Sequence, residues 1–260
     1  MENLINKVDH ILVQSNYVKE IFNVLTEILD LPIVWDIKNF KDTFISGGVC
    51  FGNVNIEILN YSTVLRKHKI VPDKEGIIGV AFEPINSIEK IVMELNGEGV
   101  KHGGIEPFKE YIHGKSKTLW TNLFLEDLLE GSQIFFCKYE IDIQKRRQRV
   151  ANILKNRDGG KIKLERVDEI VIGYSKEETL KQWEKISIGK EKFIKRFEDG
   201  PKVKFIESEK DEILSILLKV ESIDYAKKVL VDNKYILINE ENELIFKVGE
   251  PQNLGFKLCE

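Results

Sequence analysis

Residues 8–13 of this chain read Val-Asp-His-Ile-Leu-Val, and a near copy, Val-Asp-Glu-Ile-Val-Ile, occupies residues 167–172. Each copy leads through a serine into a segment with amphipathic helical spacing. A second echo links residues 77–95 with residues 213–230, where a strand pattern passes through a Ser-Ile-acidic step into a helix pattern. Two matches in the same order indicate repeated supersecondary units that bury their faces against one another.

Around the first copy, the hydrophobic spacing predicts one strand, one helix and three further strands. Apolar residues recur with helical spacing over residues 17–29, and Pro32 ends that helix. Gly47 and Gly48 interrupt the third strand, which indicates a bulge or the close approach of a backbone or ligand. The strands are expected at residues 8–14, 33–37, 43–51 and 54–59.

The same order of elements is expected to recur. A strand over residues 77–82 precedes a helix that Ser87 can cap, and residues 100–116 are interpreted as a long loop with at most one strand. Residues 143–160 break the pattern with a basic run and a Gly-Gly turn, so they are interpreted as a connector. A solvated face is one reading of that run, and contact with phosphate is the other. Later strands are expected at residues 118–124, 133–142, 162–174, 202–207, 212–220, 235–239 and 243–248, and later helices at 176–186 and from 222 onward.

Composition narrows the class of protein. The 260 residues are 42% hydrophobic and 32% charged, as in a folded protein with a sizeable core. The net charge of -4 is small for this length and disfavours nucleic-acid or membrane binding. The three cysteines are far apart, so neither a disulfide framework nor a cysteine zinc site is indicated. With no apolar segment typical of a signal peptide or a membrane span, a cytoplasmic globular protein is expected.

Three features together resemble one known family. They are the opening Val-Asp-His-Ile strand with its helix, the strand that ends at Asn55–Leu59, and the strand Gln133–Tyr139. In these the sequence resembles the vicinal oxygen chelate superfamily, which contains glyoxalase-like proteins, bleomycin-resistance-like proteins and extradiol dioxygenases. The resemblance implies an α+β fold of repeated βαβββ modules whose curled mixed sheets surround a cleft. It implies a glyoxalase-like domain of two paired modules at residues 1–142, a connector at 143–160 and a second, shorter glyoxalase-like half at 161–260.

The resemblance also implies a metal position. Family members bind a divalent metal through the first and last strands of each paired module, and His10 and Glu57 fall on those positions. Imidazole nitrogen and carboxylate oxygen suit zinc, iron, nickel or manganese. Alternatively, His10 is a hydrogen-bonded strand residue and Glu57, which alternates with isoleucines, faces solvent. On the sequence, the cleft is expected in the first half, lined by these two residues.

The other ligand positions depart from the family pattern. Gly79 stands where the partner module should supply a ligand, and the matching last strand offers Phe136 or Cys137, of which only Cys137 could bind a metal. His102 or His113 could supply missing ligands, although ordinary loop roles suit both. In the second half, Glu169 replaces the histidine, and residues 243–246 place apolar Ile245 near the carboxylate position.

Two functions therefore stay open. One is a metal-dependent lyase, isomerase or dioxygenase that acts on a small oxygenated molecule. The other is a metal-free protein that binds or sequesters a small molecule, as bleomycin-resistance-like proteins do. The expected partner in both cases is a small-molecule ligand or substrate, with no nucleic acid and no membrane, and a homodimer is left open. The fold alone does not decide between the two.

Overall fold

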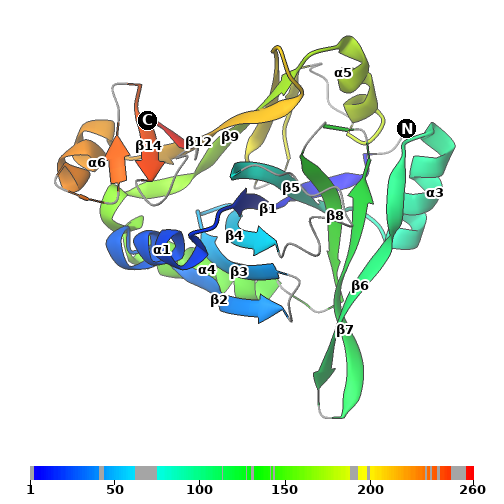
Figure 1. Ribbon diagram of the computed structural model, residues 1–260, viewed down its shortest axis with the longest axis horizontal. Coiled ribbons are helices and arrows are strands. Elements are labelled where there is room, and N and C mark those ends of the chain that lie inside the picture. The colour runs from blue at the N-terminus through cyan, green and yellow to red at the C-terminus, as the bar shows by residue number, and fades with distance from the viewer. Residues whose placement is uncertain are drawn as a thin grey trace.

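The computed structural model describes residues 3–40, 44–61, 75–112, 114–126, 128–129, 132–140, 142, 144–187, 193–197, 200–231, 233–234, 236–238, 241–246 and 256–260. Its strands form two mixed sheets, which we call sheet A and sheet B (Figure 1). No helix of the described residues is long and apolar enough to cross a membrane.

Sheet A is built from the first half of the chain and is curled. Its eight strands lie in the order β2-β3-β4-β1-β5-β8-β7-β6. At the centre β1 and β5 pair antiparallel, while β4 runs parallel to β1 and β8 runs parallel to β5. The sheet is therefore two βαβββ modules side by side. The strands are β1 (Ile5–Gln14), β2 (Ile33–Phe40), β3 (Phe44–Cys50), β4 (Asn55–Tyr61), β5 (Gly76–Pro84), β6 (His102–Ile112), β7 (Lys115–Leu125) and β8 (Gln133–Tyr139).

The helices of both modules bury one face in the main core. Helix α1 (Val18–Asn23) continues into a π-helical turn at Val24–Ile28, and α3 (Ile88–Glu98) belongs to the second module. The Ser87 hydroxyl accepts a hydrogen bond from the Lys90 N–H at 3.4 Å, and Gly99, at a φ of 65°, ends α3 in the left-handed region that favours glycine. Leu12, Leu59, Ile78, Ala81, Phe135 and Cys137 form a separate cluster, which identifies the inner face of sheet A.

Sheet B is built from the second half and has the order β10-β11-β9-β12-β15-β14-β13. Helix α6 (Ile223–Leu230) completes a βαβββ module with β12 to β15, whereas α5 (Glu177–Glu184) lies in a module whose described strands are β9 to β11. The expected α+β fold of repeated βαβββ modules is thus confirmed. The strands are β9 (Leu164–Tyr174), β10 (Ile194–Lys195), β11 (Lys202–Glu207), β12 (Glu212–Val220), β13 (Ile236–Ile238), β14 (Glu243–Phe246) and β15 (Phe256–Cys259).

The segment that joins the sheets is largely helical. Helix α4 (Gln144–Asn156) packs near β3, and a short 3-10 turn at Gly160–Ile162 precedes β9. Val150 and Leu154 are buried in the main core, while Gln148 is exposed. The basic run therefore begins an amphipathic helix in which Lys145 and Arg149 are exposed, as on a solvated face, whereas Arg147 is partly buried.

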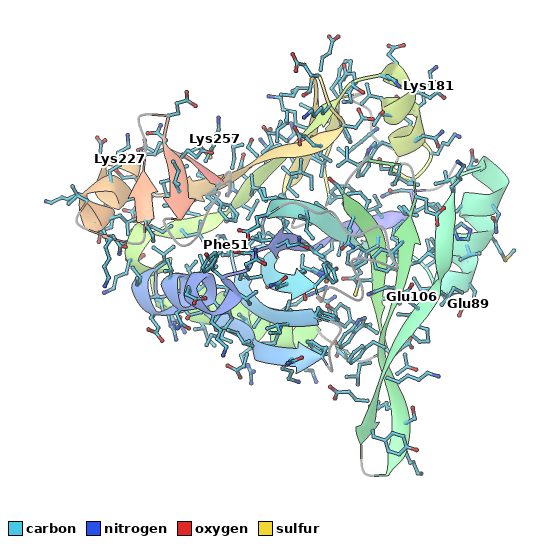
Figure 2. The ribbon with its side chains drawn as sticks, in the orientation of Figure 1. Phe51, Glu89, Glu106, Lys181, Lys227 and Lys257 are labelled. Atoms are coloured by element: carbon cyan, nitrogen blue, oxygen red, sulfur yellow. The ribbon has the colours of Figure 1, made fainter. Side chains whose placement is uncertain are left out.

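The two sheets share one hydrophobic core. Phe51 stacks on Phe256 with ring centroids 5.8 Å apart, and Phe82 meets Trp183 edge-on at 5.9 Å. The amide of Asn53 donates to the Val167 carbonyl and accepts from the Val167 N–H, each at 3.0 Å, as a neighbouring strand would. The halves are thus packed by apolar contact, with Phe51 at their junction (Figure 2), and joined by hydrogen bonds between the Asn53 side chain and the backbone of β9.

Two stretches differ in detail from what the sequence predicted. Most of the loop expected at residues 100–116 is the edge strand β6, whose long antiparallel pairing with β7 outweighs a glycine- and proline-containing sequence. The bulge expected at Gly47 and Gly48 is present as an irregular register with β2 on both sides of the Trp35–Gly48 pair. A close approach is present as well, and a side chain causes it, because a methyl group on Gly48 would lie 2.3 Å from the ring of Trp35.

Candidate functional site

A β-bulge in β1 brings Asp9 and His10 together. Val8 pairs with Phe82 and His10 pairs with Ala81, so Asp9 is an extra residue that interrupts the alternation of β1. Both side chains can then meet on one side of the sheet, and the Asp9 Oδ2 atom lies 2.6 Å from His10 Nδ1. Only 1% of the Asp9 side chain is exposed to solvent.

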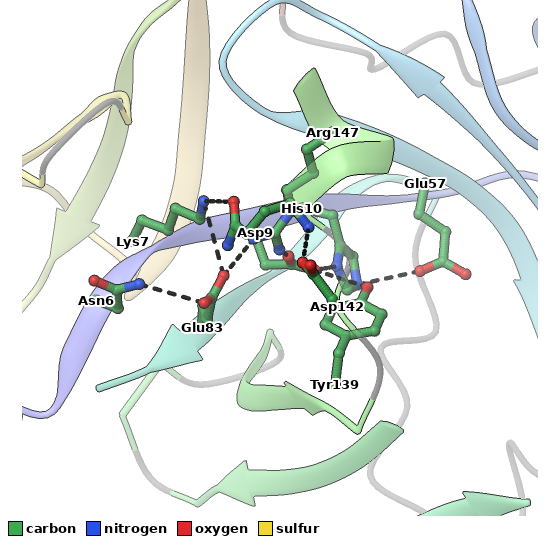
Figure 3. Close-up of polar contacts among 10 residues, drawn as sticks. Asn6, Lys7, Asp9, His10, Glu57, Glu83, Tyr139, Asp142 and Arg147 are labelled. Atoms are coloured by element: carbon green, nitrogen blue, oxygen red, sulfur yellow. Dashed lines mark hydrogen bonds and ion pairs between the residues drawn. The ribbon is translucent and has the colours of Figure 1, made fainter. Parts of the chain in front are cut away.

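Glu57 contacts the second ring nitrogen of His10, the one that Asp9 does not contact. Strand β4 runs parallel to β1 with His10 opposite Asn55, and Glu57 lies two residues further along the same face. Its Oε2 atom is 3.2 Å from His10 Nε2 (Figure 3). The ring of Phe135 meets the imidazole edge-on at 5.7 Å, and that of Trp35 does so at 6.4 Å. The two residues selected from the sequence therefore meet on the inner face of sheet A, where His10 also contacts two aromatic rings.

The contact between His10 and Glu57 depends on where the protons of the imidazole lie. An ionised carboxylate only accepts hydrogen bonds, so an ionised Asp9 makes His10 Nδ1 the donor. The remaining nitrogen, Nε2, then faces a second carboxylate at 3.2 Å. Two lone pairs at that distance repel, so a proton or a cation between Nε2 and Glu57 is needed for the contact to be favourable. The arrangement Asp9–His10–Glu57 can hold and exchange a proton with a bound molecule.

Arg147, from helix α4, also reaches this site. Its guanidinium forms ion pairs with Asp9 and with Glu83 of β5 (Figure 3). It also lies over the ring of Tyr139, 5.7 Å from the centroid, and burial lowers the pKa of Arg147 to about 10. The Tyr139 hydroxyl donates to Asp9 Oδ2 at 3.1 Å. Sequence reasoning missed Arg147 and Glu83, because nothing in the basic run distinguishes one inward arginine from its exposed neighbours.

The partner module supplies no further ligand at the matching positions. Strands β4 and β8 each have seven residues and end in tyrosine, so Glu57 corresponds to Phe135. At Gly79 an added methyl group would lie 2.3 Å from the Gln133 carbonyl oxygen, which leaves no room for a side chain. Cys137 does lie on the inner face, but burial raises the pKa of its thiol to about 12, so it is protonated at neutral pH.

The residues present do not fit a full metal site. His10 and Glu57 are two ligand types at a suitable separation, yet tight sites use three or four protein ligands. No group of three or more His, Cys, Asp or Glu side chains that could hold a metal occurs within the described part of the chain. The ring nitrogens of His102 contact the Gly103 carbonyl and the Asn96 side chain, and His113 lies outside the described residues.

The second half carries a different pair at the same positions. Strand β11 runs parallel to β9 with Lys202 opposite Glu169, as Asn55 lies opposite His10 in sheet A. Two residues further along, Lys204 corresponds to Glu57, and its Nζ atom lies 3.9 Å from Glu169. An ion pair thus stands where the first half has His10 and Glu57.

The closing strand of the second half was placed wrongly from the sequence. Ile245 lies in β14, which pairs with β13 and β15, whereas β15 itself lies beside β12. The position beside the central strand therefore falls in Phe256–Cys259.

Paired βαβββ modules with curled mixed sheets define a class of architecture, and this is the fold that the resemblance to the vicinal oxygen chelate superfamily implied. Similar solved structures include the 2,3-dioxygenase LapB from Pseudomonas sp. KL28, at 12% identity and a TM-score of 0.61, over 99% of this chain and 93% of that one. A hypothetical protein from Staphylococcus aureus matches at 13% identity and a TM-score of 0.60, over 97% of this chain and 99% of that one.

A variant of homoprotocatechuate 2,3-dioxygenase from Brevibacterium fuscum matches at 9% identity and a TM-score of 0.58, over 98% of this chain and 71% of that one. No protein-family model matches the sequence, and no curated protein matches it significantly. At these identities the likeness establishes the fold alone.

Proposed function

We propose that this protein binds a small oxygenated molecule on the inner face of sheet A, through His10 and Glu57, without a resident metal. The observation that carries the proposal is the 3.2 Å contact between His10 Nε2 and Glu57 on a face that also carries a cluster of apolar and aromatic side chains. Small-molecule sites combine apolar walls with a few convergent polar groups, which is the composition found here.

The chemistry of the pair defines what it can recognise. A ligand hydroxyl can donate to the Glu57 carboxylate, and His10 can donate to or accept from a ligand oxygen. Phe135 and Trp35, which both lie edge-on to the imidazole, provide apolar contact beside it. If the bound molecule carries an acidic proton, the same pair can act as a general base, which makes proton transfer the chemistry open to this site.

The test is ligand-observed NMR with a panel of small hydroxy- and oxo-compounds, after dialysis of the protein against EDTA. We expect at least one compound to bind, and its dissociation constant to rise roughly 10- to 100-fold in His10→Ala and in Glu57→Gln, because a hydrogen bond to a charged group contributes about 1.5–3 kcal/mol. Arg157→Met, which removes an exposed ion pair with Asp30, is the matched control and should leave binding unchanged.

Metal analysis of the same protein separates this proposal from the metal-dependent enzyme. Stoichiometric metal that disappears in His10→Ala, together with binding that EDTA abolishes, would establish the metal-dependent alternative in its place. Binding that survives EDTA but does not respond to either substitution would place the ligand elsewhere.

A further inference from the structure

We infer that Arg147 is a positioning residue for His10: helix α4 of the connector completes the site by fixing Asp9, which in turn fixes the imidazole. The inference rests on the proposed function for its biological meaning, since it concerns the same site. It adds that the site depends on a residue outside the two modules that form sheet A.

Geometry directs Arg147 to this task. On a helix, residues three and four apart share a face, and Gln144, Arg147, Val150 and Leu154 follow that spacing in α4. Val150 and Leu154 anchor the face in the core, and Gln144 accepts a hydrogen bond from Lys7 of β1 at 3.5 Å. The helix is thus held against sheet A on both sides of Arg147, whose side chain is directed at the site (Figure 3).

The guanidinium joins two strands. One terminal nitrogen pairs with Asp9 of β1 and the other with Glu83 of β5, so a planar fork spans the central strand pair at the bulge. Arginine suits this bridging, because its donors diverge in a fixed plane, whereas lysine presents a single charged point. Glu83 also lies 3.9 Å from Lys7 Nζ, and Arg147 forms an ion pair with the buried Asp9.

The consequence falls on His10. Arg147 takes Asp9 Oδ1, and Oδ2 is left to accept from His10 Nδ1 and the Tyr139 hydroxyl. A carboxylate held in this way keeps the Nδ1 proton in place and turns Nε2 toward Glu57. Without Arg147, Asp9 loses its cation, and the orientation of the imidazole is no longer fixed.

The test uses the full chain without a ligand, so it is independent of whether any compound binds. Histidine labelled with 15N reports the Nδ1–H proton of His10 at one fixed pH, and loss of the signal in His10→Gln assigns it. We expect a slowly exchanging Nδ1–H in the wild type, exchange at least tenfold faster in Arg147→Met, and an intermediate rate in Arg147→Lys. Arg157→Met should match the wild type, because its ion pair is exposed.

If Arg147→Met does not fold, the double variant Arg147→Met with Glu83→Gln takes its place, because it removes the second carboxylate that would otherwise lose its partner. Circular dichroism checks that each variant is folded. A His10 Nδ1–H signal that keeps its wild-type position and exchange rate in the folded single or double variant would overturn the inference. If the Nδ1–H signal of His10 is lost in folded Arg147→Met and no compound binds to the wild type, the positioning role of Arg147 is supported and the proposed function is refuted.

Discussion

At Gly48 the requirement for glycine comes from a single aromatic ring. An added methyl group would lie 2.3 Å from Trp35, whose side chain donates from Nε1 to the Ser46 hydroxyl at 3.2 Å and also borders His10. Gly48→Ala should therefore lower the free energy of unfolding by about 1–3 kcal/mol, the usual cost of overpacking. Urea unfolding measures it. Gly104→Ala, with no atom within 4 Å, is the control and should stay within about 0.5 kcal/mol.

The buried thiol of Cys137 makes stability depend on pH. Burial raises its pKa from 9.0 to about 12, so the unfolded chain releases this proton before the folded chain does. The associated stability is present below pH 9.0 and is lost as pH rises from there toward 12. The free energy of unfolding, measured in urea at several pH values above 8, should fall with pH, and Cys137→Ala should reduce the slope. An unchanged slope in that variant would assign the effect to other groups.

At the scale of elements, the sequence predicted most of the frame. A short β-rich run identified β1, alternation identified β4, and Ser87 with Gly99 marks both ends of α3, because periodicity and caps are local signals. Helix α4 was not predicted, because its apolar residues stand among basic ones. Only the tertiary structure shows that these apolar residues pack against the core. The His10–Glu57 contact followed from family positions, whereas Arg147 required a tertiary structure, since the bulge at Asp9 that receives it is invisible in a sequence.

Helix α4 should contribute to stability as an element of the core. Leu154 is buried, and truncation to alanine removes most of its apolar contact, so Leu154→Ala should cost about 2–5 kcal/mol of unfolding free energy. Gln148→Ala, on the exposed face of the same helix, should change it by less than about 0.5 kcal/mol. Chemical denaturation followed by circular dichroism compares them. Equal effects of the two substitutions on the free energy of unfolding would show that α4 links the two halves without contributing to the core.

At the scale of the whole molecule, the shared core predicts one cooperative unfolding transition. The ring centroid of Trp183 lies 5.9 Å from that of Phe82 in the first half and 5.2 Å from that of Phe205 in the second. With Trp35 and Trp120 replaced by phenylalanine, the fluorescence of Trp183 therefore reports the junction. Fluorescence and far-ultraviolet circular dichroism should give coincident urea midpoints. A fluorescence change at clearly lower urea would mean that the halves separate first.

The division of the chain at residues 143–160 into two domains stays a prediction.

Because the two sheets have matching strand registers, a His–Glu pair could be introduced into sheet B at the equivalent positions. His10 and Glu57 occupy one geometric slot, and Glu169 and Lys204 occupy its counterpart in sheet B. Placing the pair in sheet B takes two changes, Glu169→His and Lys204→Glu, at positions that already have the spacing, and fixing the new imidazole would also need a counterpart of Arg147. Because equivalent positions exist in both sheets, one half can change its side chains while the other keeps its own. The positions in sheet B are therefore suitable for engineering a second site.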